Sequence, residues 1–364
     1  MYDMYIELSE DTTLPDNTVR YYLTKVVDNE EVALDEKSSH YLSDGIDSVD
    51  KNKKIYKVDT NDLTSIGDYA FDNCTKLTNM TLPNMVTSIG EYAFSDCKGI
   101  TSLEVPSSVS SIGSYAFKNI SNIHLFVSNG YMKNTKHTVL YGVSNVTITI
   151  LDDVQEIRDY SFLGWLNLTS IILPNTIRSI GISAFSGCSS IASITLPDSV
   201  ETIGKSCFYG CTSLTTINVP SKVKKLSDEV FYDCDKLKTI NLASGLTEIG
   251  TECFKYCSNL SSIELPDTVT LIGSYAFSGC DKLTSIKLSE TLTTIKNNAF
   301  FHCSALETIN IPHNVTYMGS NIFEGCTALK TINVDNTEEF VNTNWASDWK
   351  YAKPSGATIN YLRT

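Results

Sequence analysis

Residues 260–283, LSSIELPDTVTLIGSYAFSGCDKL, carry the pattern that decides the fold. The pattern is L-x-x-I-x-L-P-x-x-V-x-x-I-G-x-x-A-F-x-x-C, and it recurs along the chain every 23 residues, with one interval of 45 between successive Phe residues. A fixed period held over this length indicates a solenoid, in which each repeat buries its apolar face only by stacking on its neighbours. The Phe position of the pattern is occupied by Phe71, Phe94, Phe117, Phe162, Phe185, Phe208, Phe231, Phe254, Phe277, Phe300 and Phe323.

The two halves of the repeat predict different local structures. Ile263 and Leu265 alternate with polar residues, which is typical of a short strand with one buried face. Pro266 follows, and it ends the strand because it has no N–H to donate. The second half has apolar residues at offsets that share one helical face, so it predicts a short helix of about two turns containing Ile272, Ala276, Phe277, Cys280 and Leu283.

This pattern resembles the BspA-type (Treponema pallidum-type) leucine-rich repeats, LxxIxLPxxVxxIGxxAFxxC, over roughly residues 58–334. The resemblance implies an α/β fold: a right-handed leucine-rich-repeat solenoid with a parallel β-sheet, short helices, about twelve repeats, and N-terminal and C-terminal caps. The Asn or Cys that usually follows the strand is replaced, for example by Met85, Ser108 and Thr176. We therefore expect the proline turn to close each strand instead.

The chain divides into three predicted parts. Residues 1–57 are a small acidic β-rich N-terminal cap or subdomain, residues 58–334 are the solenoid, and residues 335–364 are an aromatic C-terminal cap. An open solenoid end would expose core and an unpaired strand edge, which is why caps are expected. The unit at residues 129–150 is irregular because it lacks the Ala-Phe pair and the Cys. We expect Phe126 and Trp165 to fill the resulting space in the core.

Composition excludes several classes of protein. The 364 residues are 42% hydrophobic and 19% charged, which is unlike a disordered chain or a membrane bundle. No apolar run is long enough to span a bilayer, so no membrane insertion is expected. The net charge of −14 argues against nucleic acid as a partner. The first ten residues do not have the pattern of a signal peptide, which fits either a cytosolic protein or one whose export signal has been removed.

The sequence predicts no catalytic site, no metal site and no cofactor. Nine of the 11 cysteines occupy the Cys position of the repeat, and Cys207 and Cys253 occupy the Ala position, so we expect buried free thiols. The histidines fall in different units, and no catalytic triad, phosphate-binding loop or HExxH motif is present. The protein is therefore predicted not to be an enzyme.

The outward positions of the predicted strands form two rows. The first is Asn79, Ser102, Leu125, Thr147, Ser170, Ser193, Thr216, Thr239, Ser262, Ser285, Thr308 and Thr331. The second is Thr81, Glu104, Val127, Thr149, Ile172, Thr195, Asn218, Asn241, Glu264, Lys287, Asn310 and Asn333. These rows are either ladders that suit a sheet surface or a polar face that holds a ligand. If a ligand binds there, the predicted ligand-binding residues are Asn218, Asn241, Glu264, Lys287 and Asn310, where amides and charges replace plain hydroxyls.

A tyrosine stripe offers a competing surface. Its members are Tyr69, Tyr92, Tyr115, Tyr160 and Tyr275, with Tyr209 and Tyr232 after the Phe of adjacent units. Tyrosine is frequent in recognition surfaces because it provides contact area at low entropic cost. The stripe could equally cover the repeat beneath it.

The family resemblance implies a non-enzymatic binding or adhesion module, located at the cell surface or secreted. Its expected partners are an extracellular-matrix or cell-surface protein, or a peptide, engaged through the solenoid. Two alternatives stay open: a structural or spacer segment of a larger surface or viral assembly, and a glycan-binding module. Fold alone does not decide between them.

Overall fold

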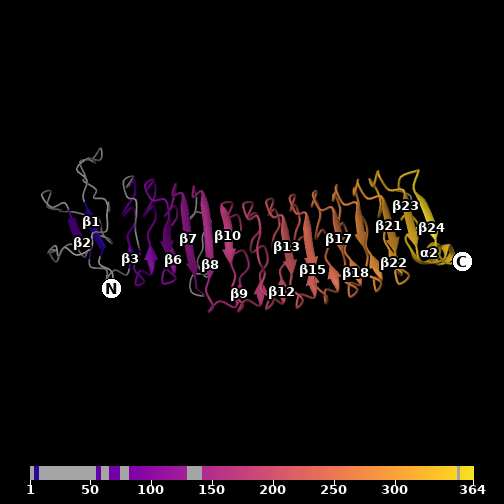
Figure 1. Ribbon diagram of the computed structural model, residues 1–364, viewed down its shortest axis with the longest axis horizontal. Helices are drawn as coiled ribbons and strands as arrows, with labels where there is room; N and C mark the ends of the chain where they lie inside the picture. The colour runs from indigo at the N-terminus through magenta and orange to yellow at the C-terminus, as the bar shows by residue number, and fades with distance from the viewer. Residues whose placement is uncertain (1–3, 8–54, 59–64, 74–81, 129–141, 351–352) are drawn as a thin grey trace. The chain divides into compact units, whose positions relative to one another are not determined.

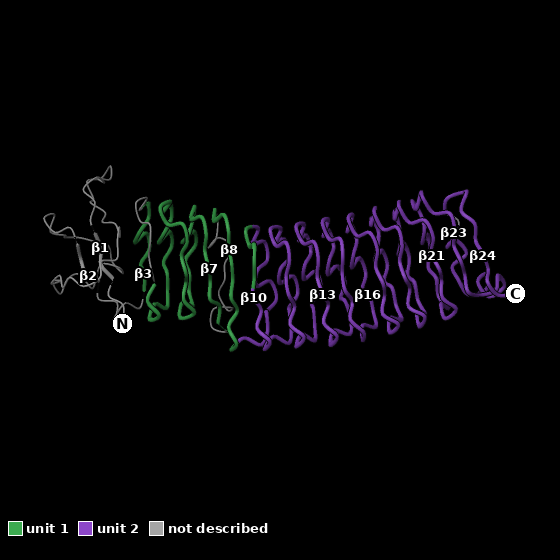
Figure 2. The backbone as a smooth tube through the Cα atoms, in the orientation of Figure 1, with its two compact units in different colours: residues 1–153, 167–171 green, residues 154–166, 172–364 purple. Residues whose placement is uncertain are grey.

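The computed structural model describes residues 4–7, 55–58, 65–73, 82–128, 142–350 and 353–364. The chain forms two compact units (Figure 2), which are described separately below. Unit 1 comprises residues 1–153 and 167–171, and unit 2 comprises residues 154–166 and 172–364.

Most of the described repeats contribute one strand to a parallel arrangement that we call the face strands, stacked side by side within each unit (Figure 1). The repeat at residues 191–197 contributes only an isolated bridge, between Ser193 and Thr216. In unit 1 they are β5 (Leu103–Val105), β7 (Asn122–Val127), β8 (Asn145–Ile150) and β10 (Leu168–Ile172), which reaches one residue beyond the unit. In unit 2 they are β13 (Thr216–Val219), β15 (Thr239–Leu242), β17 (Ser262–Glu264), β19 (Ser285–Lys287), β21 (Thr308–Ile311), β23 (Thr331–Val334) and β24 (Thr358–Tyr361). The predicted strands and their parallel register are therefore confirmed in these repeats.

A second set of parallel strands, each two residues long, precedes the Gly position of the pattern. Unit 1 has β3 (Ser65–Ile66), β4 (Ser88–Ile89) and β6 (Ser111–Ile112). Unit 2 has β9 (Glu156–Ile157), β11 (Ser179–Ile180), β12 (Thr202–Ile203), β14 (Lys225–Leu226), β16 (Glu248–Ile249), β18 (Leu271–Ile272), β20 (Thr294–Ile295) and β22 (Tyr317–Met318). Two residues are too few for an alternating pattern to show, which explains why sequence periodicity did not reveal them.

The predicted short helices are wrong. The segment that follows Ile272 is a series of turns, and its backbone has positive φ at Tyr275 (56°) and Gly279 (70°), on either side of Ala276 and Phe277. A right-handed helix requires negative φ at every residue, so two such residues four apart exclude it. The Phe277 N–H instead donates to the Ala299 carbonyl of the next repeat at 2.8 Å. Backbone hydrogen bonds to the next repeat, from Tyr275, Phe277 and Gly279, therefore alternate with turn bonds inside the repeat, from Ala276, Ser278 and Cys280.

The proline turns behave as expected. The Pro266 carbonyl accepts a hydrogen bond from the Val269 N–H at 3.0 Å, which closes a four-residue turn. The same contact joins Pro220 to Val223 at 3.1 Å. These turns lead the chain from each face strand to the next two-residue strand.

Stacked phenylalanine rings form the centre of each unit. In unit 1, Phe94 lies between Phe71 and Phe117, with centroid distances of 5.1 and 6.0 Å. In unit 2, the rings from Phe162 to Phe323 are fully buried and stack with centroid separations between 5.2 and 6.0 Å. The edge of Trp349 meets the last of these rings at 6.4 Å. The phenylalanine spine of unit 2 thus ends on an aromatic residue from the C-terminal region.

The irregular unit differs in part from expectation. Trp165 is buried in unit 2 and packs edge-on against Phe162 at 5.1 Å, consistent with a role in filling the core. Phe126 does not fill the core, because it lies on the outward side of β7 and stacks on His124 at 4.6 Å. The intervening residues 129–141 lie outside the described residues.

The two terminal regions are described to different extents. At the N-terminus, β1 (Met4–Glu7) pairs antiparallel with β2 (Ile55–Val58), and the rest of the predicted cap lies outside the described residues. At the C-terminus, α2 (Glu338–Asn344) begins at Thr337, whose side chain accepts from the Phe340 N–H. β24 then pairs with β23, so the face strands continue into residues 335–364. The domain boundaries and the role of both regions as caps stay predictions.

The cysteines of the repeat are buried next to the phenylalanine spine. Ten are described and all of them are buried, while Cys74 lies outside the described residues. The Cys257 Sγ–H donates to the Phe231 carbonyl of the preceding repeat at 3.1 Å. Cys211 makes the same contact with the Phe185 carbonyl at 3.2 Å. A thiol at this position therefore satisfies a buried backbone acceptor as well as filling space.

We expect Phe231→Ala to lower the free energy of unfolding by about 3–5 kcal/mol, because it leaves a cavity between two fully buried rings. Urea denaturation monitored by circular dichroism measures this loss, and Tyr317→Ala, which truncates an exposed aromatic ring of β22, serves as the control. A loss below about 1 kcal/mol would contradict the structural role of the spine.

We expect the folded protein to lose stability as the pH rises above about 9. Burial raises the pKa of Cys211 to about 12, and it also raises the pKa of Cys234 and Cys257. In alkali the unfolded chain releases these protons while the folded chain retains them, so the unfolding free energy falls with increasing pH. Urea midpoints at about pH 7 and about pH 9.5 measure the fall.

The matched control is the triple variant Cys211→Ala, Cys234→Ala, Cys257→Ala, which should lose less stability over the same interval. Thiol labelling should also be slow in the native protein and complete after denaturation. An equal pH dependence in the variant, or rapid labelling of the native protein, would overturn this account.

Candidate functional site

The outward side chains of the face strands in unit 2 form two parallel rows. In β17, Ser262 and Glu264 are exposed while Ile263 between them is buried, and the neighbouring strands repeat this alternation. We call the row that contains Glu264 the second row. Its members in unit 2 from β13 onward are Asn218, Asn241, Glu264, Lys287, Asn310, Asn333 and Asn360.

Hydrogen bonds between neighbouring amides connect part of the second row. The Asn241 Nδ2 donates to the Asn218 Oδ1 at 2.7 Å. The Asn333 Nδ2 donates to the Asn310 Oδ1 at 2.8 Å, and the Asn360 Nδ2 donates to the Asn333 Oδ1 at 2.9 Å. Each bond fixes the orientation of an amide and uses part of its hydrogen-bonding capacity. The second row is therefore in part a ladder that stabilises the sheet surface.

The ladder is interrupted by an ion pair between β17 and β19. Glu264 lies opposite Lys287 in the strand register, and their side chains are hydrogen-bonded as well as oppositely charged. The hydrogen bond and the charge of Glu264 raise the pKa of Lys287. Both side chains are more than 60% exposed, so the pair adds little to stability and its charges face solvent.

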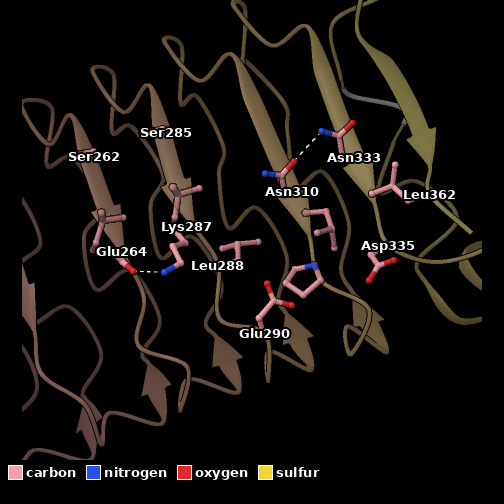
Figure 3. Close-up of a pocket in the computed structure, with 14 residues that line it drawn as sticks. Ser262, Glu264, Ser285, Lys287, Leu288, Glu290, Asn310, Asn333, Asp335 and Leu362 are labelled. Carbon is pink, nitrogen blue, oxygen red and sulfur yellow. Dashed lines mark hydrogen bonds and ion pairs between the residues drawn. The ribbon is translucent and has the colours of Figure 1, made fainter.

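A groove of about 540 Å³ lies over β17, β19, β21 and β23 (Figure 3). Glu264, Lys287 and Asn310 line it, so the structure brings together three of the five predicted ligand-binding residues. Asn218 and Asn241 are outside its lining, on β13 and β15. The other polar and charged lining residues are Ser262, Ser285, Glu290, Asn333 and Asp335, and the apolar ones are Ile263, Ile286, Leu288, Ile311, Pro312 and Leu362.

The C-terminal segment supplies one wall of this groove. Leu362 is 61% exposed, and its N–H donates to the Val334 carbonyl at 2.9 Å. The Arg363 guanidinium holds Asp335 through two hydrogen bonds, at 2.8 and 3.1 Å, and lowers the pKa of that carboxyl. Sequence reasoning missed this wall, although the sequence TIN at residues 358–360 repeats residues 331–333 and indicates a further strand.

The structure corrects the predicted outward rows in β7. Leu125 and Val127 were placed on the outer surface, but both are buried, whereas His124 and Phe126 face outward. Glu104 of β5 lies opposite His124, so the spacing there is 20 residues (124 minus 104) instead of 23. The shorter spacing changes which residues of β7 face outward, and a constant period of 23 residues cannot predict that change.

Four tyrosine side chains of unit 2, those of Tyr209, Tyr232, Tyr256 and Tyr275, pack against one another or lie close to one lysine. Tyr209 and Tyr232 stack at 4.6 Å. The Lys255 Nζ lies 5.1 Å from the ring centroid of Tyr275 and 5.4 Å from those of Tyr232 and Tyr256. In unit 1, the ring of Tyr92 stacks between two other members of the predicted stripe, Tyr69 and Tyr115, at 5.2 and 5.0 Å. Many of these ring faces are thus already occupied by intramolecular contacts.

Neither a metal centre nor a membrane span is found in the described part of the chain. No cluster of three or more His, Cys, Asp or Glu residues there has the arrangement of a metal site. None of the helices described is both long and apolar enough to cross a bilayer.

Comparison with solved structures finds leucine-rich repeat proteins similar to this chain. A leucine-rich repeat protein from Bacteroides ovatus is 25% identical, with a TM-score of 0.57 and coverage of 98% of both chains. A leucine-rich cell-surface protein from Faecalibacterium prausnitzii is 23% identical, with a TM-score of 0.40 and coverage of 99% of this chain and 94% of its own. The leucine-rich repeat protein of T. pallidum is 22% identical, with a TM-score of 0.39 and coverage of 65% of this chain and 92% of its own.

Comparison with curated proteins gives no match. By contrast, residues 51–165, 155–269 and 247–348 match the family described as "BspA type Leucine rich repeat region (6 copies)". These segments together extend over residues 51–348 and include the face strands that form the groove. The 23-residue period, the parallel face strands and this match lead to one assignment: the chain belongs to the BspA-type leucine-rich repeat family.

Proposed function

We propose that this protein is a non-enzymatic binding module that engages a protein partner through the groove on the face strands of unit 2. The observation that carries the proposal is the groove itself, where the amide ladder gives way to charged side chains over an apolar floor. Leucine-rich repeat solenoids present such extended surfaces because each repeat adds one strand to the same face.

The chemistry of the groove suits binding rather than catalysis. Its lining offers hydroxyls, amides, carboxylates and one ammonium group, and it contains neither Cys nor His. The isoleucines of its floor alternate with the polar rows, so a partner segment finds apolar area and hydrogen bonds together. An extended segment of a matrix or cell-surface protein has both kinds of group.

The location and the class of partner rest on the family. BspA-type repeats suggest a surface or secreted module that contacts host matrix proteins, peptides or other cells. The alternatives, a glycan-binding module and a spacer, predict different binding partners and are separated by the experiment below.

We expect Asn310→Trp to weaken binding to an extracellular-matrix protein at least about tenfold, because an indole would occupy the groove. Asn218→Trp is the matched control, since Asn218 belongs to the same row and to an equivalent amide pair but lies outside the groove. Biolayer interferometry of the full chain against a panel of purified matrix proteins measures affinity, and both variants should melt at nearly the same temperature.

Three results would reject the proposal. Binding that survives Asn310→Trp but is lost on deletion of residues 1–57 would assign recognition to the N-terminal region. Binding only on a glycan array would favour the glycan-binding alternative. Binding to neither matrix proteins nor glycans would favour the spacer.

A further inference from the structure

We infer that the groove selects partner segments that carry a lysine or arginine, whose cationic head pairs with Glu290 and whose aliphatic stem lies along the exposed Leu362. This inference rests on the proposed function and names the chemistry that the same site recognises.

The carboxylates of the groove differ in whether they are already paired. Glu264 is paired with Lys287, and Asp335 is paired with Arg363. The carboxylate of Glu290 has no ion pair or side-chain hydrogen bond to any described residue. Only the backbone carbonyl of Glu290 is engaged, by the Asn314 Nδ2 at 2.7 Å. The groove therefore presents one carboxylate without an ion pair, whose charge adds to that of Glu264 in raising the pKa of Lys287.

The position of Glu290 suits an incoming cation. Glu290 is exposed and lines the groove next to Leu288, while Asp335 and Leu362 lie across from it (Figure 3). The net charge of −14 adds a long-range attraction for cationic partners. A new pair at an exposed groove contributes mainly specificity and association rate, and it weakens with salt.

The apolar wall favours lysine and arginine over a compact cation. These side chains place methylene groups on apolar surface while the charged head reaches water or a carboxylate. Leu362 provides such surface, being 61% exposed in a segment held by the Asp335–Arg363 pair. The wall is therefore present before a ligand arrives.

An acidic partner fits the groove less well. The cation that lines it, Lys287, is already bound to Glu264, whose hydrogen bond and charge raise the pKa of the ammonium group. An acidic ligand would have to compete with Glu264 for Lys287 and would also be repelled by Glu290.

The test uses fluorescein-labelled nonapeptide libraries in which one central position is fixed as Lys, Arg, Glu or norleucine and the others are varied. Norleucine retains the aliphatic stem of lysine without its charge. Fluorescence anisotropy with the full chain should show the Lys and Arg libraries binding at least about fivefold more tightly than norleucine, and the Glu library binding least. This advantage should shrink as salt concentration increases.

Variants assign the preference to residues. Glu290→Gln should abolish the advantage of Lys and Arg over norleucine, and Glu290→Lys should favour the Glu library. Leu362→Ala should weaken the Lys and norleucine libraries by the same factor. The matched control is Glu324→Gln, which neutralises an exposed carboxylate outside the groove and should leave the preference unchanged.

The failures of the two proposals are distinguishable. Peptide or matrix binding that is lost in Asn310→Trp but does not respond to Glu290→Gln or to salt would overturn this inference and leave the proposed function standing. If Asn310→Trp changes no binding of any kind, the proposed function fails and this inference fails with it. A preference for Lys and Arg that persists in Glu290→Gln would place the recognising carboxylate elsewhere and would reject the role of Glu290.

Discussion

Hydrogen bonding between the backbones of adjacent repeats is the constraint on which the rest of the structure depends. Neighbouring strands must lie about 4.8 Å apart, and every other contact between repeats has to fit that separation. The turn segments obey it too, because the Phe277 N–H bonds to the Ala299 carbonyl of the next repeat. Ring faces in contact lie about 3.5–4 Å apart, which is less than the strand separation. The rings can touch at the repeat spacing only if they are offset or tilted, and their centroids in unit 2 are 5.2 to 6.0 Å apart. Offset stacking therefore follows from the backbone separation.

The small residues of the repeat meet the same constraint. A Cβ atom added to Gly273 would lie 2.5 Å from the Gly250 carbonyl carbon of the preceding repeat, so a larger residue would push the repeats apart. Cysteine fits beside the spine because its thiol is small and can donate to the phenylalanine carbonyl of the previous repeat. A residue that was expected only to fill space thus also satisfies a buried acceptor.

The same periodicity shapes the surface on which binding is proposed. Where successive repeats carry the same amide, as in Asn218 and Asn241, the side chains satisfy one another. The groove lies where this repetition stops, at the ion pair between Glu264 and Lys287 and beside Glu290. Recognition in a repeat protein therefore depends on departures from the consensus, since identical neighbours tend to pair among themselves. The wall formed by Leu362 adds a second departure, because it comes from a segment that lies beyond the last regular 23-residue repeat.

The sequence by itself determined the repeat, the inward residues outside β7, the face strands of the regular repeats and the proline turns, because alternating burial and a constant period leave a direct trace in residue order. It also located Glu264, Lys287 and Asn310 on one exposed row. The sequence pattern could not distinguish a helix from the observed turns, because Ile272, Ala276 and Phe277 point into the core in either structure. The two structures differ in backbone conformation, which is set by the positive φ of Tyr275 and Gly279. The outward direction of Phe126 depends on the 20-residue step from Glu104 to His124. Only the tertiary structure decided which polar side chains of the groove are available to a ligand. Asp335 is paired with Arg363, whereas the Glu290 carboxylate has no ion pair with a described residue. Such pairing depends on distances between segments that are far apart in the chain.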